Sequence, residues 1–232
     1  MPDVDKNKKS EIKIKILKDG PYLVSGRIPL SEMIIISRGN CNEYHQGRRF
    51  PLQEKYSLCR CGQTKKSPYC DGSHVKAGFV GKETASRADY ANRAELLEGP
   101  NLDLLDDDRC AYVRFCQRGE GNAWELTENS NDPNLRQEAI KAACECPSGR
   151  LVVLEKDGTP IEPDFEPSIE ILQDNPLDIS GPIYVKGNIP IESEDGFTYE
   201  VRNRLALCRC GKSCNKPFCD ASHVAAEYHD RV

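Results

Sequence analysis

Both ends of the chain contain runs in which apolar and polar residues alternate. Ile12, Ile14 and Ile16 alternate with lysines near the N-terminus, and Ile169 and Ile171 flank a glutamate later in the chain. Successive side chains of a β-strand point to opposite faces, so a period of two predicts short, antiparallel strands. Each run is followed by a Gly-Pro or Asn-Pro turn and then by a Ser-Gly pair, so that Gly and Pro punctuate the pattern.

The two ends are copies of one unit. The segment IKILKDGPYLVSGRI at 14–28 is similar to IEILQDNPLDISGPI at 169–183, and CRCGQTKKSPYCDGSH at 59–74 is similar to CRCGKSCNKPFCDASH at 208–223. The first copy has a few extra residues, and we expect a loop or hairpin at 33–53 to hold them. In both copies a further short strand leads into the cysteines.

The residues between the copies follow another pattern. The segment 87–97 reads as a helix, and the segment from Cys110 to Cys116 reads as a loop that enters a short helix. A second helix is predicted after Asp132, which is a suitable N-cap, with Pro133 at its first position and Pro147 beyond its end. A strand and a turn follow at 149–158.

These patterns predict an α+β protein. Small β-rich units at 10–80 and 165–228 would flank a small α+β unit at 88–158. Only 38% of the residues are hydrophobic and the mean hydropathy is −0.62, so the apolar cores of such small domains would be small. Small domains of this kind need additional cross-links such as bound metals or disulfides, for which the twelve cysteines are candidates. The net charge of −5 argues against a general role in binding nucleic acid.

The sequence predicts a cytoplasmic protein without a membrane segment. The N-terminus has no apolar signal region, and no run of about 18 apolar residues occurs in the chain. In a reducing compartment, closely spaced cysteines more often bind metals or carry out redox chemistry than form disulfides.

The repeated motif has the spacing Cys-x-Cys-x8-Cys-x3-His. Cys59 and Cys61 lie two apart and would face one centre from a strand, while Cys70 and His74 lie four apart and would share the face of a helix. Structural zinc sites more often contain paired Cys-x2–4-Cys and His-x3–5-His units, whereas this motif has one histidine. The residues alone leave zinc as an alternative to an iron–sulfur cluster.

Both motifs resemble the CDGSH iron–sulfur (mitoNEET-like) family. The first copy matches the family pattern throughout, and the second departs from it only at Ala221, which replaces a glycine. If that position requires a positive φ, Ala221 costs some stability. The resemblance implies a [2Fe–2S] cluster in each copy and an intrachain pseudo-dimer of the two copies. The ligands that it implies are Cys59, Cys61, Cys70 and His74 in the first copy and Cys208, Cys210, Cys219 and His223 in the second.

The middle segment is similar to single-cluster ferredoxins, because CAYVRFC at 110–116 is followed by CECPSG at 144–149. Cys110, Cys116 and Cys146 would hold a [3Fe–4S] cluster, and Cys144 is the nearest candidate for the fourth ligand of a [4Fe–4S] cluster. The alternative is a ferredoxin-like fold that binds no cluster.

The chain contains no Gly-rich phosphate loop, nucleophile triad or carboxylate pair in a catalytic pattern. We therefore expect a protein that is not an enzyme and that transfers electrons or stores and transfers clusters. Its partner would be a redox protein or a cluster acceptor. The alternatives are a structural or redox-sensing metal module and a relay subunit of a larger redox enzyme.

Overall fold

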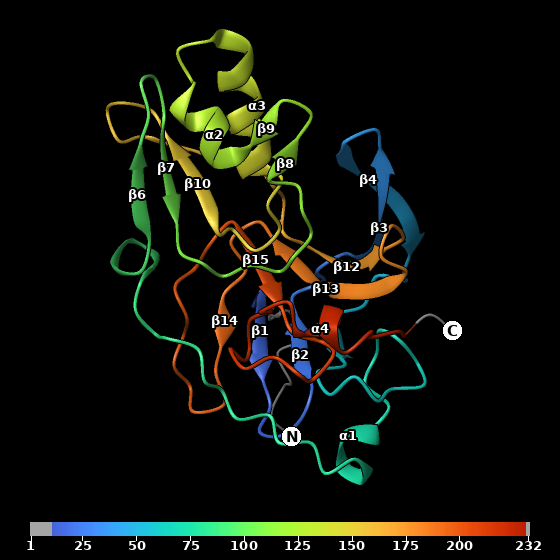
Figure 1. Ribbon diagram of the computed structural model, residues 1–232. Helices are drawn as coiled ribbons and strands as arrows, with labels where there is room; N and C mark the ends of the chain where they lie inside the picture. The colour runs from blue at the N-terminus through green and yellow to red at the C-terminus, as the bar shows by residue number, and fades with distance from the viewer. Residues whose placement is uncertain (1–10, 231–232) are drawn as a thin grey trace.

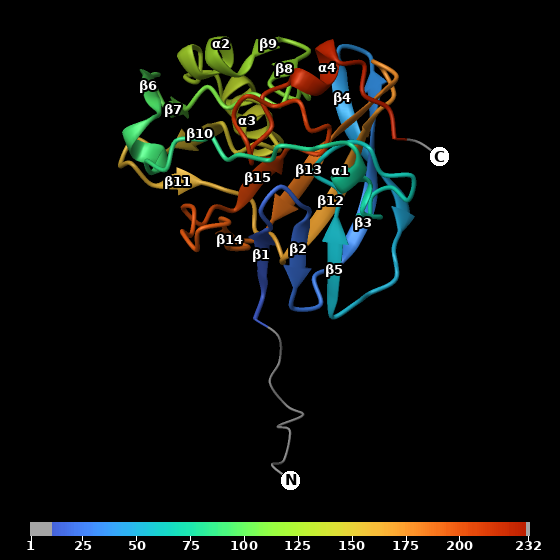
Figure 2. The ribbon, with the colours of Figure 1, turned by 90° about the horizontal axis from the view of Figure 1, so that it is seen from below.

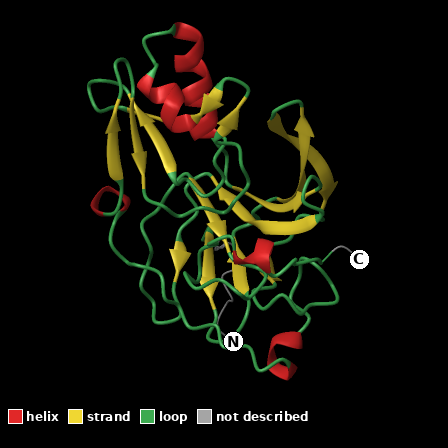
Figure 3. Cartoon of the chain, in the orientation of Figure 1, coloured by secondary structure: helices red, strands yellow, loops and turns green. Residues whose placement is uncertain are grey.

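The computed structural model describes residues 11–230 of the 232-residue chain. The predicted domain 10–80 therefore begins at a residue that lies outside the described residues. Strands and loops make up most of the described chain, and its helices are few and short (Figure 3). This agrees with the β-rich units expected at both ends. None of the helices between residues 11 and 230 is long and apolar enough to cross a membrane.

The two copies of the repeated unit form two sheets. The order of the first sheet is β14 (Ile191–Glu192), β1 (Lys13–Ile16), β2 (Tyr22–Ser25) and β5 (Lys55–Leu58). The order of the second sheet is β15 (Arg204–Leu207), β13 (Ile179–Lys186), β12 (Ser168–Asp174), β3 (Leu30–Arg38) and β4 (Cys41–Arg49). The alternating runs thus form strands, as predicted, and β5 and β15 lead into the cysteines of the two copies.

Each sheet includes a strand that the opposite copy supplies. Strand β3 of the first copy pairs in parallel with β12, with Leu30 opposite Ile169, and β14 of the second copy pairs in parallel with β1, with Ile191 opposite Ile14 (Figure 2). The exchanged strands hydrogen-bond to sheet edges that would otherwise be unpaired. The copies consequently share one hydrophobic core, to which all four of these residues belong.

The extra residues of the first copy lie in a long antiparallel hairpin. Strands β3 and β4 are joined by a turn at 39–40 and extend together to one side of the molecule (Figure 1). This confirms the hairpin expected at 33–53.

The middle region has its own antiparallel sheet. Its order is β11 (Pro160–Ile161), β10 (Leu151–Leu154), β7 (Asp103–Asp106) and β6 (Glu95–Glu98). The remaining elements of the region are the hairpin of β8 (Gln117–Arg118) and β9 (Gly121–Asn122), followed by α2 (Ala123–Glu128) and α3 (Pro133–Cys144). Helix α3 confirms the helix predicted after Asp132, whose Oδ1 accepts a hydrogen bond of 2.7 Å from the backbone N of Asn134.

The helix predicted at 87–97 is wrong. The segment contains one 3-10 turn, η1 (Tyr90–Asn92), and then enters β6. The Tyr90 hydroxyl donates hydrogen bonds of 3.0 and 2.8 Å to the carbonyls of Leu105 and Arg150 in the middle region. These contacts and the pairing of β6 with β7 outweigh the local preference for a helix.

Each motif ends in a helix of one turn, α1 (Ser73–Lys76) in the first copy and α4 (Ser222–Ala225) in the second. In Figure 1, α1 lies at the lower, outer end of the molecule. Helix α4 lies further inside, against β13. The two motifs therefore occupy different surroundings although they have the same local sequence.

Candidate metal centres

The first motif brings its four candidate ligands together as two pairs. The Sγ atoms of Cys59 and Cys61 lie 3.7 Å apart, and Cys70 Sγ lies 3.4 Å from His74 Nδ1. Two ligand atoms on one tetrahedral metal lie roughly 3.4–3.8 Å apart when the metal–sulfur distance is about 2.3 Å and the metal–nitrogen distance about 2.1 Å. Each pair therefore has the spacing of two ligands on one metal ion.

The second motif repeats this geometry. The Sγ atoms of Cys208 and Cys210 lie 3.7 Å apart, and Cys219 Sγ lies 3.4 Å from His223 Nδ1. Among residues 11–230, no three His, Cys, Asp or Glu side chains form a group that would hold a single metal ion. The donors of each motif are thus arranged as two couples, and all twelve cysteines, each of which lies in the described chain, are free thiols.

The local structure around the ligands differs from the expected strand and helix. Strand β5 ends at Leu58, so Cys59 and Cys61 lie in a loop. Helix α1 begins at Ser73, so Cys70 precedes it. The same holds in the second copy, where β15 ends before the cysteines and α4 begins after Cys219. Loops, rather than regular elements, position six of the eight candidate ligands.

A buried arginine between the paired cysteines shapes each loop. Arg60 is 1% exposed and donates hydrogen bonds to the carbonyls of Gly20, Leu17 and Gly81, at 2.9, 3.1 and 2.9 Å. Arg209 is 2% exposed and likewise donates to the carbonyls of Gly181 in β13 and Leu172 in β12, at 2.6 and 2.8 Å. These hydrogen bonds fix the backbone of the loop that carries the two flanking thiols. The sequence analysis missed this role, although the shared Cys-Arg-Cys triplet was a signal for it.

An aspartate in each motif links its two halves by hydrogen bonds. Asp71 Oδ1 accepts from the backbone N of Ser73 at 3.0 Å, and its Oδ2 accepts from the backbone N of Lys65 at 2.9 Å. Asp220 makes the corresponding bonds to Ser222 and Cys214, at 3.0 and 2.7 Å. These bonds tie the third cysteine and the histidine to the loop that carries the first two cysteines.

The two cysteine loops contact each other. A Cβ added to Gly62 would lie 2.5 Å from the carbonyl oxygen of Cys210, and one added to Gly211 would lie 2.5 Å from the carbonyl oxygen of Cys61. Both glycines have a positive φ, 73° and 77°. Glycine is required at both positions because a Cβ would clash with the opposite loop and because a positive φ is unfavourable for other residues. The reciprocal contact shows that the two motifs lie back to back.

The motifs differ in how deeply they are buried. Cys70 and His74 are partly exposed, whereas Cys219 and His223 are only 3% and 4% exposed. Burial, followed by the nearby charge of Arg209, lowers the pKa of His223 to about 4. The second histidine therefore stays neutral over a wider range of pH than an imidazole in water.

The middle region covers the second motif. Ala111, Val113 and Phe115 form one apolar cluster with Cys219. Between them, Arg114 donates hydrogen bonds of 2.9 and 3.0 Å to the carboxylate of Asp174 at the end of β12. The loop that contains Cys110 is thereby held against the second motif and away from the first.

Three of the four candidate ligands in the middle region line one cavity. They are Cys110, Cys116 and Cys146, and they share the cavity wall with Trp124 and Arg150. Burial, followed by the nearby Cys146 and Cys110, raises the pKa of Cys116 to about 11. The shared cavity wall brings the three thiols close together.

Cys144 does not line this cavity. Its thiol lies 3.6 Å from the carbonyl oxygen of Ile161 in β11 and donates to it. In the loop before Cys116, the backbone N of Tyr112 donates to Cys110 Sγ at 3.3 Å. The structure thus separates Cys144 from the three cysteines with which the sequence analysis grouped it.

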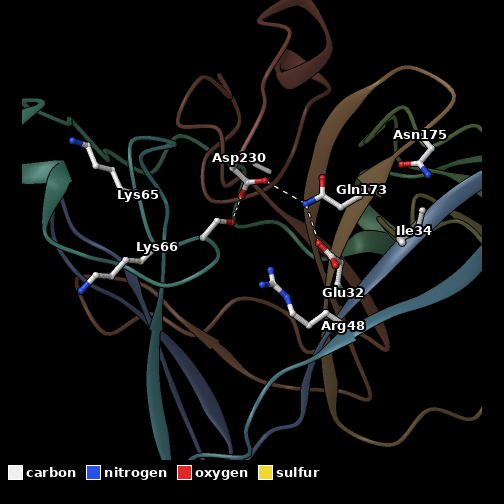
Figure 4. Close-up of a pocket in the computed structure, with 9 residues that line it drawn as sticks. Glu32, Ile34, Arg48, Lys65, Lys66, Gln173, Asn175 and Asp230 are labelled. Carbon is white, nitrogen blue, oxygen red and sulfur yellow. Dashed lines mark hydrogen bonds between the residues drawn. The ribbon is translucent and has the colours of Figure 1, made fainter. Parts of the chain in front are cut away.

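A larger pocket elsewhere contains no cysteine or histidine among its lining residues. Its walls include Arg48, Lys65 and Gln173, and Gln173 Nε2 donates to Glu32 Oε1 at 3.3 Å and to Asp230 Oδ1 at 3.4 Å (Figure 4). Asp230 also accepts from the hydroxyl of Ser67 and pairs with Arg209, so it ties both motifs together. We assign this pocket a structural role.

Comparisons with known protein families agree with these sites. Residues 19–75 and 180–224 match the family described as iron-binding zinc finger, CDGSH type, and residues 97–156 match the family described as divergent 4Fe–4S mono-cluster. No curated protein and no solved structure matches the chain.

Proposed function

From the premise that this is a CDGSH-type protein, in which two CDGSH regions flank a divergent 4Fe–4S segment, we propose that it carries electrons through three iron–sulfur centres. The first and second centres are [2Fe–2S] clusters, and the middle centre is a [3Fe–4S] or [4Fe–4S] cluster. The ligands we propose are Cys59, Cys61, Cys70 and His74 for the first, Cys208, Cys210, Cys219 and His223 for the second, and Cys110, Cys116 and Cys146 for the middle.

The observation that carries this proposal is the pairing of donors in both motifs. In a [2Fe–2S] cluster each iron takes two protein ligands, and the sulfides bridge the irons. The couples Cys59–Cys61 and Cys70–His74 have the spacing of such ligand pairs. The same couples recur in the second motif at the same distances. A mononuclear zinc site would instead gather all four donors around one point.

The protein's own residues hold the donors and exclude water. The cluster supplies a reversible one-electron change when it is bound. Arg60 and Arg209 fix the cysteine loops, and the backbone N of Lys212 points at Cys210 Sγ from 3.5 Å. Backbone donors of this kind stabilise negative charge on sulfur. Such donors help the cysteine ligands to keep their geometry while the charge of the site changes.

The arrangement supports an order for the three centres. The middle region packs on Cys219 of the second motif, and the second motif contacts the first through Gly62 and Gly211. The first motif alone has a partly exposed cysteine and histidine. We propose that electrons pass between the middle and first centres through the second, and that the interlocked copies act as an intrachain pseudo-dimer.

The surface around the first motif suits an acidic redox partner. Val75 and Val80 are 74% and 72% exposed, and the same stretch of the chain contains four exposed lysines: Lys65, Lys66, Lys76 and Lys82. Charge complementarity of this kind accelerates association and weakens with salt. We place this encounter in the cytoplasm and propose no catalytic residue.

Transfer of the first cluster to an acceptor protein is a second candidate function. The partial exposure of Cys70 and His74 favours it, because an acceptor thiol could reach these ligands. A neutral histidine is also released from a metal more readily than a thiolate when the pH falls. The buried second motif lacks this access.

The test is the metal and sulfide content of the full chain, purified without oxygen. We expect about four irons and four sulfides from the two motifs and about three or four further irons from the middle region, with a red-brown colour. Zinc without visible absorbance would contradict the proposal and favour a structural module.

Single substitutions sharpen this measurement. Cys70→Ser and Cys146→Ser should each lower the iron content, by the first and the middle cluster respectively. Cys214→Ser and Cys144→Ser are matched controls, since these thiols lie in or next to the same motifs but outside the ligand sets, and they should leave the iron content unchanged. Loss of iron in Cys144→Ser would show that Cys144 is a ligand of the middle cluster.

A further inference from the structure

A buried hydroxyl beside the second motif lacks a partner. Tyr228 follows α4, is 8% exposed, and belongs to one apolar cluster with Cys208 and Cys210. Its Oη is buried, and no hydrogen-bond partner for it occurs within residues 11–230. A buried donor without an acceptor is costly, so it calls for a specific explanation.

The position of Tyr228 is fixed on several sides. Its backbone N donates to the carbonyl of His223 at 3.0 Å, and its carbonyl accepts from the backbone N of Ser180 at 2.7 Å. The guanidinium of Arg209 lies 5.6 Å from the centre of its ring. The ring is therefore held against Cys208 and Cys210 of the second motif, with Cys59 of the first motif also near the hydroxyl, which is not free to turn into solvent.

We propose that the hydroxyl of Tyr228 donates a hydrogen bond to a sulfur atom of the second iron–sulfur centre and raises its reduction potential. The inference rests on the proposed function, because the missing acceptor belongs to the cluster. A phenol has a pKa of about 10 and so carries its proton at neutral pH. Reduction adds negative charge to the cluster, so a donor stabilises the reduced form more than the oxidised form.

The first copy provides a built-in comparison. Phe79 occupies the equivalent position, since its backbone N donates to the carbonyl of His74 at 3.0 Å and Arg60 lies 5.4 Å from its ring centre. The backbone contact and the neighbouring cation are repeated, and the hydroxyl is not. The chain thus gives the second centre a donor that the first centre lacks, and this difference favours an electron on the second.

The test is a redox titration of the full chain with its clusters, in the wild type and in Tyr228→Phe. We expect a shift of the second centre to a more negative potential, by about 30 to 59 mV, which is a threefold to tenfold change in its reduction equilibrium. The reduction potential of the first centre should not change. Tyr56→Phe is the control, because the Tyr56 hydroxyl is also buried but donates to the carbonyl of Ile28 at 2.9 Å; it should shift neither centre.

A second readout detects the proton itself. Pulsed EPR of the reduced second centre should show the coupling of a proton that exchanges in D₂O, and Tyr228→Phe should lack it. An unchanged potential and an unchanged proton coupling would overturn the inference while leaving the proposed function intact. If Tyr228→Phe shifted the potential of the first centre instead, the hydroxyl would donate to the first cluster and the inference would be wrong. Absence of any cluster at the second motif in the wild type would refute the proposed function.

Discussion

The first and second motifs hold their candidate ligands at the same distances, yet one pair of Cys and His ligands is partly exposed and the other is buried. The difference does not arise within the motifs. It arises from the loop around Val113 and Phe115, which packs on Cys219, whereas no apolar cluster within residues 11–230 includes Cys70. The comparison teaches that the motif determines how a centre is built, and that the rest of the chain determines what can reach it.

Removing the ion pair that holds this loop should have the largest effect. Arg114→Ala leaves the carboxylate of Asp174 without its bidentate partner. The Asp174 side chain is only 3% exposed and the Arg114 side chain is 22% exposed, so this ion pair is largely buried. We expect a loss of about 3 kcal/mol in the free energy of unfolding. The variant should also make the second centre accessible to chelators, which is measured as bleaching in the presence of a chelator.

A surface ion pair provides the control for this variant. Arg87 pairs with Asp195 at 2.7 Å, and both side chains are about half exposed, at 45% and 54%. Arg87→Ala should leave stability and bleaching at wild-type values, because exposed pairs contribute little. If Arg114→Ala behaved like Arg87→Ala, the middle region would not be what protects the second centre.

Acid should remove the first cluster before the second. The pKa of His223 is lowered to about 4 by burial, so a proton competes with the metal for its ring only as the pH approaches that value. His74 is partly exposed, so a proton from solvent can reach its ring directly. At pH 5 we expect the first centre to bleach faster than the second, because the lowered pKa of His223 keeps that ring neutral at this pH.

Substitution of the histidines identifies which centre bleaches. His74→Cys should remove the fast phase of bleaching, and His223→Cys should leave it unchanged. Bleaching of both centres at one rate in the wild type would contradict the difference in exposure. Equal bleaching of wild type and His74→Cys would show that the histidine is not the acid-labile ligand.

The smallest expected effect concerns the one departure from the CDGSH pattern. Ala221 has φ 68° and its counterpart Gly72 has φ 85°, so the position does require the left-handed conformation. Ala221→Gly should therefore raise the free energy of unfolding by about 1 kcal/mol. Gly72→Ala should lower it similarly through the backbone alone, because a Cβ there would meet nothing within 4 Å. Chemical denaturation measures both, and a stabilising Gly72→Ala would contradict the explanation.

The sequence predicted the parts of the protein that are encoded locally. Spacing and repetition indicated the candidate ligands, Asp132 and Pro133 identified the start of α3, and the alternating isoleucines identified β1 and β12. Residues near one another in the chain determine each of these features. Their geometry could therefore be inferred from the residues themselves.

The features that depend on distant residues were not predicted. The pairing of β3 with β12 requires an edge that the other copy supplies. The end of the segment at 87–97 enters strand β6 because β7 offers it a partner. The role of Arg60 depends on carbonyls about twenty to forty residues away in both directions. Neither periodicity nor spacing encodes such contacts.

The central claim is that the second centre, and not the first, adjoins the middle centre. EPR of the fully reduced chain tests it most directly, with Cys70→Ser and Cys219→Ser identifying the two CDGSH signals. We predict that the second centre relaxes faster than the first and that Cys116→Ser, which removes the middle cluster, slows the relaxation of the second centre specifically. A relaxation rate of the second centre that is the same with and without the middle cluster would contradict the account.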